Sequence, residues 1–263
     1  MSIHPAHDAL REILVDAGRY ALAGRQEADV EWKEDGSPVT SVDRELDARI
    51  AEGLARAFAD AGVRGEEGAH EEGPGGTFYV DPIDGTRAFM QGLAYWGPTV
   101  ALVRGGQLEL GALYLPMLDD WWFAARGAGA WRNGERLTGP ATRGRRRDRI
   151  LFAPSRIHDA PPGLWPGKVR VLGSAAAHLA LVAAGSGSAA LIPEWSLWDV
   201  GCGALLVTES GGVLCGLDGS AVDLVGGERG LPFLAGAPTA LQDVVQGLRG
   251  HQGSAEDARV GRE

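Results

Sequence analysis

The chain has 263 residues, of which 44% are hydrophobic and 23% are charged, and its formal net charge is −10. This length supplies one large hydrophobic core or two fused ones, and no run of about eighteen apolar residues offers a membrane-spanning helix. The negative charge disfavours general nucleic-acid binding, and the start of the chain lacks the continuous apolar region of a signal peptide. We therefore expect a soluble cytoplasmic protein without nucleic-acid or membrane partners.

Two helices are predicted first, over about residues 5–24 and 42–60, because apolar residues recur there at helical spacing. Thr40 followed by Asp43 fits a capping box at the start of the second helix. Capping and a functional role for Asp43 are compatible, since an aspartate in the first turn can still turn a free oxygen toward Thr86.

A short buried strand is predicted at Thr77–Val80, ending at Pro82 because proline has no N–H to donate to the sheet. The carboxylates of Asp81 and Asp84 can then face one point while Ile83 offers its carbonyl oxygen. Hard oxygen ligands of this kind suit Mg²⁺. The alternative is that Asp-Pro and Asp-Gly are ordinary turn dipeptides.

A helix is predicted to follow directly, and its first backbone amides, at Gly85 and Thr86, would point outward unpaired. A helix N-terminus is an anion site, and glycine allows a phosphate to approach closely. These two residues are therefore candidates for binding phosphate.

Antiparallel strands are predicted next. A hairpin joins Trp96–Val103 to Leu108–Tyr114, and further strands follow at Trp121–Ala125 and around the turn Asn133-Gly134. Asp119-Asp120 is predicted to be a turn. From about residue 149, strands at Ile150–Phe152, Val169–Leu172, Ala189–Ile192 and Gly212–Cys215 alternate with helices near 174–185 and 199–210, an α/β pattern.

Three parts are therefore expected. Residues 1–140 form an α+β half with most of the candidate metal ligands, residues 141–248 form an α/β half that contains Asp199, and residues 249–263 form a disordered tail.

Two further carboxylates can join Asp81 and Asp84. Glu66 lies in a loop before the predicted strand at Thr77–Val80, and Asp199 begins a later helical pattern. Together the four could hold two cations with shared ligands. Each also has an alternative explanation: Glu66 belongs to a solvated acidic stretch that runs through Glu72, and Asp199 caps a helix.

These motifs resemble the inositol monophosphatase family of Mg²⁺-dependent, lithium-sensitive phosphatases, in family order over roughly residues 5–248. The matching segments are Ser37-Pro38-Val39-Thr40 with Asp43, Gly65-Glu66-Glu67, Asp81 to Thr86 with Phe89, Gly173-Ser174-Ala175-Ala176, and Trp198-Asp199 followed by Glu209-Ser210-Gly211-Gly212.

The resemblance implies a layered αβαβα sugar-phosphatase fold, a homodimer, and two Mg²⁺ ions with a third, weaker ion near Glu66. Glu66, Asp81 and the carbonyl of Ile83 would hold the first ion, and Asp81, Asp84 and Asp199 the second. Thr86 with Asp43 or Glu66 would orient and deprotonate a metal-activated water. A divalent ion can lower the pKa of water to about 7, so no histidine or cysteine nucleophile is required.

The resemblance also implies the substrate site, formed by Gly85, Thr86, Gly173, Ser174, Ala175, Glu194 and Asp199. Inositol-1-phosphate is the leading candidate substrate. Glu194 could contact its ring hydroxyls, or it could equally be an ordinary carboxylate in a surface loop. Segments around Thr86–Phe89 and Trp121–Trp131 resemble the histidinol-phosphate phosphatase branch, and Ser37–Thr40 resembles the branch that acts on 3'-phosphoadenosine 5'-phosphate. A catalytically inactive phosphate-ligand binder is the non-enzyme alternative.

Other candidate residues have simpler explanations. None of the six histidines pairs at zinc-ligand spacing, and His178 is expected to pack within a helix of small residues. Cys202 and Cys215 are expected to be free thiols. The five arginines between Arg143 and Arg149 are expected to form a solvated loop, since no aromatic residue interleaves them.

Overall fold

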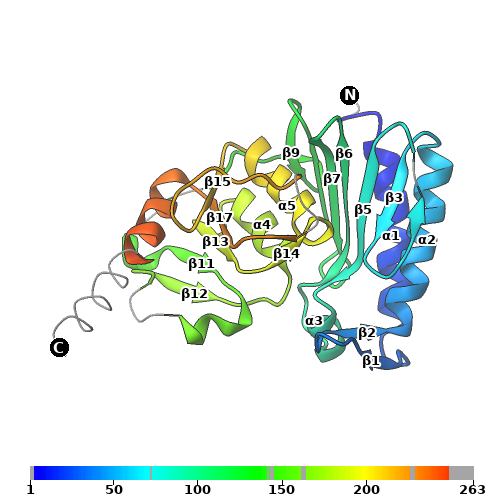
Figure 1. Cartoon of the computed structure of the whole chain (residues 1–263), viewed down its shortest axis with the longest axis horizontal. Helices are drawn as coiled ribbons and strands as arrows, with labels where there is room; N and C mark the ends of the chain where they lie inside the picture. The colour runs from blue at the N-terminus through cyan, green and yellow to red at the C-terminus, as the bar shows by residue number, and fades with distance from the viewer. Residues whose placement is uncertain are drawn as a thin grey trace.

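The chain folds into alternating layers of helices and sheets (Figure 1). A computed structural model describes residues 3–71, 73–140, 142, 145–160, 164–225 and 229–248. The layers are, in order, an outer pair of helices, an eight-stranded sheet, an inner pair of helices, a five-stranded sheet and a helix over residues 238–248. This order confirms the predicted layered αβαβα fold. The expected tail at 249–263 lies outside the described residues.

The predicted helices are confirmed to within a few residues at each end. The labelled helices are α1 (His7–Gly24), α2 (Ser41–Ala57), the short α3 (Thr86–Gln91), α4 (Ala175–Ala183), α5 (Leu197–Glu209), and the 3₁₀ turns η1 (Arg146–Asp148) and η2 (Ser155–Asp159). The helix over residues 238–248 was not predicted from the sequence. In the described part of the chain, no helix combines the length and apolarity needed to cross a membrane.

The eight-stranded sheet has the order β10-β9-β8-β7-β6-β5-β3-β4. Its strands are β3 (Gly62–Gly65), β4 (His70–Glu71), β5 (Thr77–Asp84), β6 (Gly97–Arg104), β7 (Gln107–Leu115), β8 (Asp120–Ala125), β9 (Gly129–Arg132) and β10 (Glu135–Arg136). Only the β3–β5 pair is parallel among them. The predicted hairpin is confirmed as β6 and β7. The turn prediction for Asp120 is wrong, because this residue opens β8 and is buried against Arg132 at 2.8 Å.

The five-stranded sheet has the order β12-β11-β13-β17-β15, with parallel pairing around β11 and antiparallel pairing around β17. Its strands are β11 (Ile150–Phe152), β12 (Lys168–Arg170), β13 (Ala189–Ile192), β15 (Val213–Gly216) and β17 (Phe233–Gly236). Two small ribbons add β1 (Val30–Trp32) with β2 (Pro38–Thr40), and β14 (Trp195–Ser196) with β16 (Arg229–Gly230). Both ribbons and β17 were absent from the sequence-based prediction.

Helix α5 packs between the two sheets and is buried on nearly all sides. A helix in this position needs apolar residues all round and small residues at its contacts. A Cβ on Gly201 would lie 2.6 Å from the Cβ of Ala101 in β6, and one on Gly203 would lie 2.4 Å from the Cβ of Leu179 in α4. These two glycines therefore set how closely α5 approaches its neighbours.

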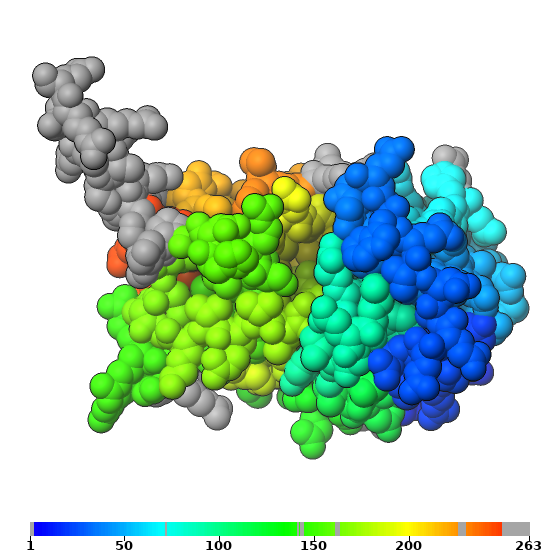
Figure 2. Space-filling model, turned by 90° about the horizontal axis from the view of Figure 1, so that it is seen from below, coloured from blue at the N-terminus to red at the C-terminus, as the bar shows by residue number. Residues whose placement is uncertain are grey.

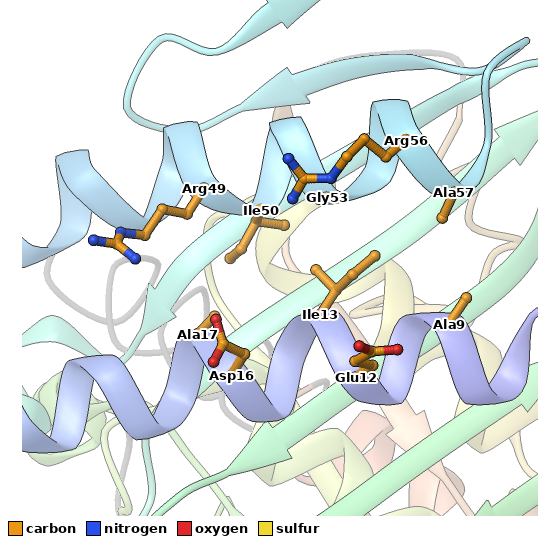
Figure 3. A pocket seen from close by; sticks show the side chains of 10 residues that line it. All are labelled: Ala9, Glu12, Ile13, Asp16, Ala17, Arg49, Ile50, Gly53, Arg56 and Ala57. Carbon is orange, nitrogen blue, oxygen red and sulfur yellow. The ribbon is translucent and has the colours of Figure 1, made fainter.

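Helices α1 and α2 cover the outer face of the large sheet, and Figure 3 shows the groove between them. Ile13 of α1 packs against Gly53 of α2 at the floor of this groove, whose volume is about 450 Å³. The rim mixes acidic residues of α1 with basic residues of α2, namely Glu12, Asp16, Arg49 and Arg56.

Strand β5 runs further than predicted. Pro82 does not end it: pairing with β6 becomes irregular between Asp81 and Asp84, and Asp84 still pairs with Gly97. The turn comes at Gly85, whose φ of 91° is left-handed and favours glycine, and α3 begins at Thr86. In a regular strand, side chains three residues apart point to opposite faces of the sheet. The irregular pairing between Asp81 and Asp84 interrupts this alternation at the end of β5.

Truncating Phe89 should test how far packing of α3 stabilises this region. Phe89 is fully buried, with its ring centroid 4.8 Å from that of Trp96 in an edge-on contact. We expect Phe89→Ala to lower the free energy of unfolding by about 3–5 kcal/mol because it leaves a cavity. Urea denaturation measures this, with Leu22→Ala, on the exposed face of α1 at 39% exposure, as a control costing within about 0.5 kcal/mol. Equal losses in the two variants would contradict the packing argument.

Candidate functional site

Carboxylates from three distant segments of the chain lie close together, and two of them line a cavity. Glu66 lies in the turn after β3, Asp81 in β5 and Asp199 in the first turn of α5, and one oxygen of each lies within 4.8 Å of the others. Glu66 and Asp199 line a cavity of about 470 Å³. The groove between α1 and α2 has a similar volume, but it mixes acidic and basic side chains. The acidic cavity is therefore the stronger candidate for a cation.

The parallel pairing of β3 with β5 explains how Glu66 reaches Asp81. The carboxyl ends of two parallel neighbours lie at the same edge of a sheet, and the amide of Glu66 donates to the carbonyl of Val80 at 3.0 Å. Asp199 belongs to the first turn of α5, and the N-terminal end of this helix lies near the same edge of the sheet. The three carboxylates thus come from a turn, a strand and a helix.

Asp199 also caps α5, as the alternative explanation proposed. Its Oδ2 accepts the amide of Ser196 at 2.9 Å, which is half of a capping box. Capping and membership of the acidic cluster therefore occur together in this residue.

Asp84 lies beside the three-carboxylate cluster and is held at the N-terminus of α4. The hydroxyl of Ser174 donates to its Oδ2, and the amides of Ala175 and Ala176 donate to its carboxylate at 3.2 and 2.8 Å. Its charge still raises the pKa values of Asp81 and Asp199. Asp84 thus links the acidic cluster to the Gly173–Ala176 segment that the sequence singled out.

The expected contact between Asp43 and Thr86 is present. Asp43 forms the predicted capping box with Thr40, and its Oδ1 lies 3.3 Å from the Oγ1 of Thr86. The same hydroxyl lies 3.2 Å from the carbonyl oxygen of Ile83. A threonine hydroxyl has one proton to donate, so it can serve only one of these acceptors at a time and keeps lone pairs for a third group.

Lys33, in the loop between β1 and β2, supplies a positive charge that sequence reasoning missed. Its Nζ lies 2.9 Å from Oε1 of Glu66 and 2.6 Å from Oε1 of Glu67. Burial disfavours the charged ammonium, but the hydrogen bonds to Glu67 and Glu66 raise the pKa of Lys33 overall. No local pattern indicates a contact between residues 33 positions apart, and only the tertiary fold creates it.

Most of the candidate substrate residues line two adjoining cavities, whereas Gly85 and Thr86 are not among the lining residues of either. Gly173, Ser174, Ala175 and Glu194 line a cavity of about 200 Å³, and Glu194 also lines the larger acidic one. The acidic cavity includes further residues that the sequence did not single out for substrate binding, namely Asp35, Ser37, Trp195, Ser196, Trp198 and Gly230. Figure 2 shows the face on which the blue β1–β2 ribbon adjoins the teal α3 segment and the yellow-green second half of the chain.

Gly85 lies where the loop before α4 meets α3. A Cβ built on it would stand 3.1 Å from the carbonyl oxygen of Gly173. This close approach gives Gly85 a packing reason, in addition to its left-handed backbone, to be a glycine.

His178 and the arginine cluster have structural roles. His178 is buried, stacks on Phe152, and accepts the amide of Leu172 at 3.0 Å; burial lowers its pKa to about 4. Arg146 and Arg149 both pair with Asp243 in the helix over 238–248, the latter at 3.1 Å. These two arginines therefore hold that helix, whereas Arg143 and Glu72 lie outside the described residues.

Full ionisation of the acidic cluster is electrostatically unfavourable without added positive charge. Burial, reinforced by Glu66, Asp84 and Asp199, raises the pKa of Asp81 well above its usual range. Burial likewise raises the pKa of Asp84 to about 6 and, with repulsion from Asp84, that of Asp199 to about 8. A divalent cation would offset this repulsion, and the hard oxygen donors fit Mg²⁺.

Comparison with known proteins places these residues in a family context. The sequence model of the inositol monophosphatase family matches residues 7–246 of this chain. The chain is 34% identical to a histidinol-phosphatase of Chlorobaculum parvum, over 76% of this chain and 82% of that protein. It is 32% identical to an inositol-1-monophosphatase of Mesorhizobium japonicum, over 81% and 88% respectively. The solved structure of extragenic suppressor protein suhB from Bartonella henselae superposes with a TM-score of 0.83 at 26% identity, covering 93% of this chain and 98% of that one.

The raised pKa values predict how stability depends on pH. Asp84 and Asp199 have pKa values of about 6 and about 8 in the folded protein, against 3.8 ordinarily. Between about pH 4 and these raised pKa values, the folded state therefore binds more protons than the unfolded state. The stabilisation that comes from the bound protons is complete below about pH 4 and is lost as pH rises through 6 and 8. We expect the melting temperature in EDTA to fall from pH ~5.5 to ~8.5.

Two comparisons check the origin of this slope. Asp199→Asn should flatten its upper part, and saturating Mg²⁺ should remove most of it, because a bound cation favours the ionised carboxylates. A melting temperature that stays level or rises over this range in EDTA would contradict the electrostatic argument.

Proposed function

Because the chain belongs to the inositol monophosphatase family of phosphatases, we propose that it hydrolyses a small phosphorylated polyol, such as inositol-1-phosphate, with Mg²⁺ as its cofactor. The observation that supports this proposal most is that carboxylate oxygens of Glu66, Asp81 and Asp199 lie within 4.8 Å of one another. The Thr86–Asp43 pair beside them supplies groups that can handle a water and its proton.

The oxygen donors divide into two overlapping sets. In our proposal, Glu66, Asp81 and the carbonyl of Ile83 hold one ion, and Asp81, Asp84 and Asp199 hold a second. A third, weaker ion would lie near Glu66. When bound, such ions lower the pKa of water to about 7 and neutralise charge on phosphate and leaving group.

Asp43 and Thr86 would position the attacking water. The Thr86 hydroxyl can donate its proton to Asp43 and accept a hydrogen bond from water with a lone pair. Burial raises the pKa of Asp43, although hydrogen bonds from Thr40 and Thr86 lower it, and a raised pKa makes a carboxylate a stronger base near neutral pH. Glu66 is the alternative base.

The rest of the substrate would lie toward α4. Gly173, Ser174, Ala175 and Glu194 line the smaller cavity next to the acidic one, where they can contact the hydroxyl groups of a polyol. Since Ser174 also donates to Asp84, a change in this segment would be felt at the proposed metal site.

Replacing Asp84 tests the second ligand set. We expect Asp84→Asn to lower Mg²⁺-dependent phosphate release from inositol-1-phosphate by at least about 100-fold, because it removes a charged metal ligand. Asparagine keeps one oxygen that can accept the Ser174 hydroxyl and the Ala176 amide, so the variant should stay folded, as circular dichroism can verify. Asp8→Asn, at an exposed position in α1, is the matched control. Wild-type turnover by the Asp84 variant would refute the two-ion assignment.

A second candidate substrate is histidinol phosphate. Asp35 and Glu194 add negative charge to the acidic cavity, which favours a leaving group with a cationic amine over a neutral polyol. The same charge disfavours the additional phosphate of 3'-phosphoadenosine 5'-phosphate. The similarity to a histidinol-phosphatase supports this candidate.

Glu194→Gln distinguishes the two leading substrates. A charge-assisted hydrogen bond contributes about 1.5–3 kcal/mol, so its loss should raise KM for histidinol phosphate about tenfold or more. The KM for inositol-1-phosphate, which carries no positive charge, should change by less than about threefold. Phosphate-release assays on both substrates measure this, and equal changes would contradict an ionic role for Glu194.

A further inference from the structure

Helix α2 carries a second buried aspartate one turn beyond Asp43. Asp47 is only 3% exposed, and it lies under the turn that follows β3. The amide of Ala69 donates to its Oδ2 at 2.7 Å. Its Oδ1 is buried and has no hydrogen-bond partner within the described chain.

The turn from Gly65 to Ala69 closes around this carboxylate. The amide of Gly65 donates to the carbonyl of Ala69 at 2.7 Å, which joins the two ends of the turn. A Cβ on Gly65 would lie 2.0 Å from Oδ1 of Asp47, so the carboxylate lies directly against the backbone of the turn. Glu66 directly follows Gly65, so this contact lies next to the backbone that carries the Glu66 side chain.

Glu66 needs such support more than the other two ligands of the cluster. Asp81 is fixed by a strand and Asp199 by a helix, whereas Glu66 is carried by a turn. Its own amide donates to Val80 at 3.0 Å, which fixes one side of the turn to β5. Asp47 fixes the other side through Ala69.

Burying a carboxylate costs desolvation free energy. Burial raises the pKa of Asp47, and the amides of Ala69 and Glu67 partly oppose this by stabilising the ionised form. An apolar residue would avoid the desolvation cost. What an aspartate adds at this position is an acceptor for the backbone amides of the turn.

We infer that Asp47 is a positioning residue for the proposed metal site, which holds the Gly65–Ala69 turn so that the carboxylate of Glu66 reaches Asp81 and Asp199. This inference rests on the proposed function, because it assigns Asp47 a role in the affinity for Mg²⁺. Asp47 itself touches neither substrate nor ion.

Two variants perturb this contact from opposite sides. Asp47→Asn replaces one acceptor by a donor that faces backbone amides, and Gly65→Ala pushes a methyl group against the carboxylate. Glu52→Gln is the matched control, since it makes the same chemical change at an exposed position of α2. Circular dichroism and melting curves establish that each variant is folded.

The readouts separate affinity for the ion from turnover. Outer-shell partners of metal ligands typically contribute 10–100-fold in affinity, so we expect Mg²⁺ binding, measured by titration calorimetry without substrate, to weaken at least about tenfold in both variants. The Mg²⁺ concentration that gives half-maximal phosphate release should rise by a similar factor, while kcat at saturating Mg²⁺ stays within about threefold. Glu52→Gln should match the wild type in both assays.

The remaining outcomes overturn the inference in distinguishable ways. If the wild type binds Mg²⁺ and hydrolyses substrate while both variants bind Mg²⁺ with unchanged affinity, Asp47 serves stability alone and the proposed function stands. If kcat falls and Mg²⁺ affinity is unchanged, Asp47 does not act through Glu66. If the wild type neither binds Mg²⁺ nor releases phosphate, the proposed function fails and this inference fails with it.

Discussion

Mutual repulsion among buried carboxylates is the constraint on which this structure depends. Burial and neighbouring negative charge both raise the pKa values of Asp81 and Asp199, so at neutral pH these carboxyl groups either keep a proton or need compensating positive charge in order to ionise. The fold supplies part of that charge. Asp84 lies at the N-terminus of α4, and Asp199 lies in the first turn of α5, where the helix dipole favours a carboxylate. Lys33 adds an ammonium group against Glu66.

The layered architecture makes this arrangement possible. The inner helices α4 and α5 pack between the two sheets, and their N-terminal ends point to the edge where the parallel strands β3 and β5 finish. Gly201 and Gly203 allow α5 to pack closely enough to bring Asp199 to that edge. Residues that a stability argument would place in the core therefore also determine the geometry of the acidic cluster.

Much of this could be predicted from the sequence, because the signals are local. Helical spacing predicted α1 and α2, and glycine turns between apolar segments predicted the β6–β7 hairpin. The order of short acidic motifs pointed to Glu66, Asp81, Asp84 and Asp199 together. The Thr40–Asp43 capping box was also visible, since both partners lie within one turn of a helix.

The features that escaped prediction depend on contacts distant in the sequence or on backbone irregularity. Lys33 pairs with residues in another loop. In the sequence, Asp47 looks like an ordinary polar residue of α2, and only the fold shows that the Gly65–Ala69 turn packs against it. Pro82 was expected to end a strand, but irregular pairing lets β5 continue past it. The strand β17 was missed although it has four residues, as many as β13, which was predicted. The two small ribbons pair only a few residues each.

The most direct test of the account is a crystal structure of the protein grown with Mn²⁺, whose anomalous scattering locates the ions independently of the protein chain. We expect two strong anomalous peaks that share Asp81 as a ligand, one also contacting Glu66 and the other contacting Asp84 and Asp199. Anomalous peaks elsewhere on the protein, or none near Asp81 at saturating Mn²⁺, would contradict it.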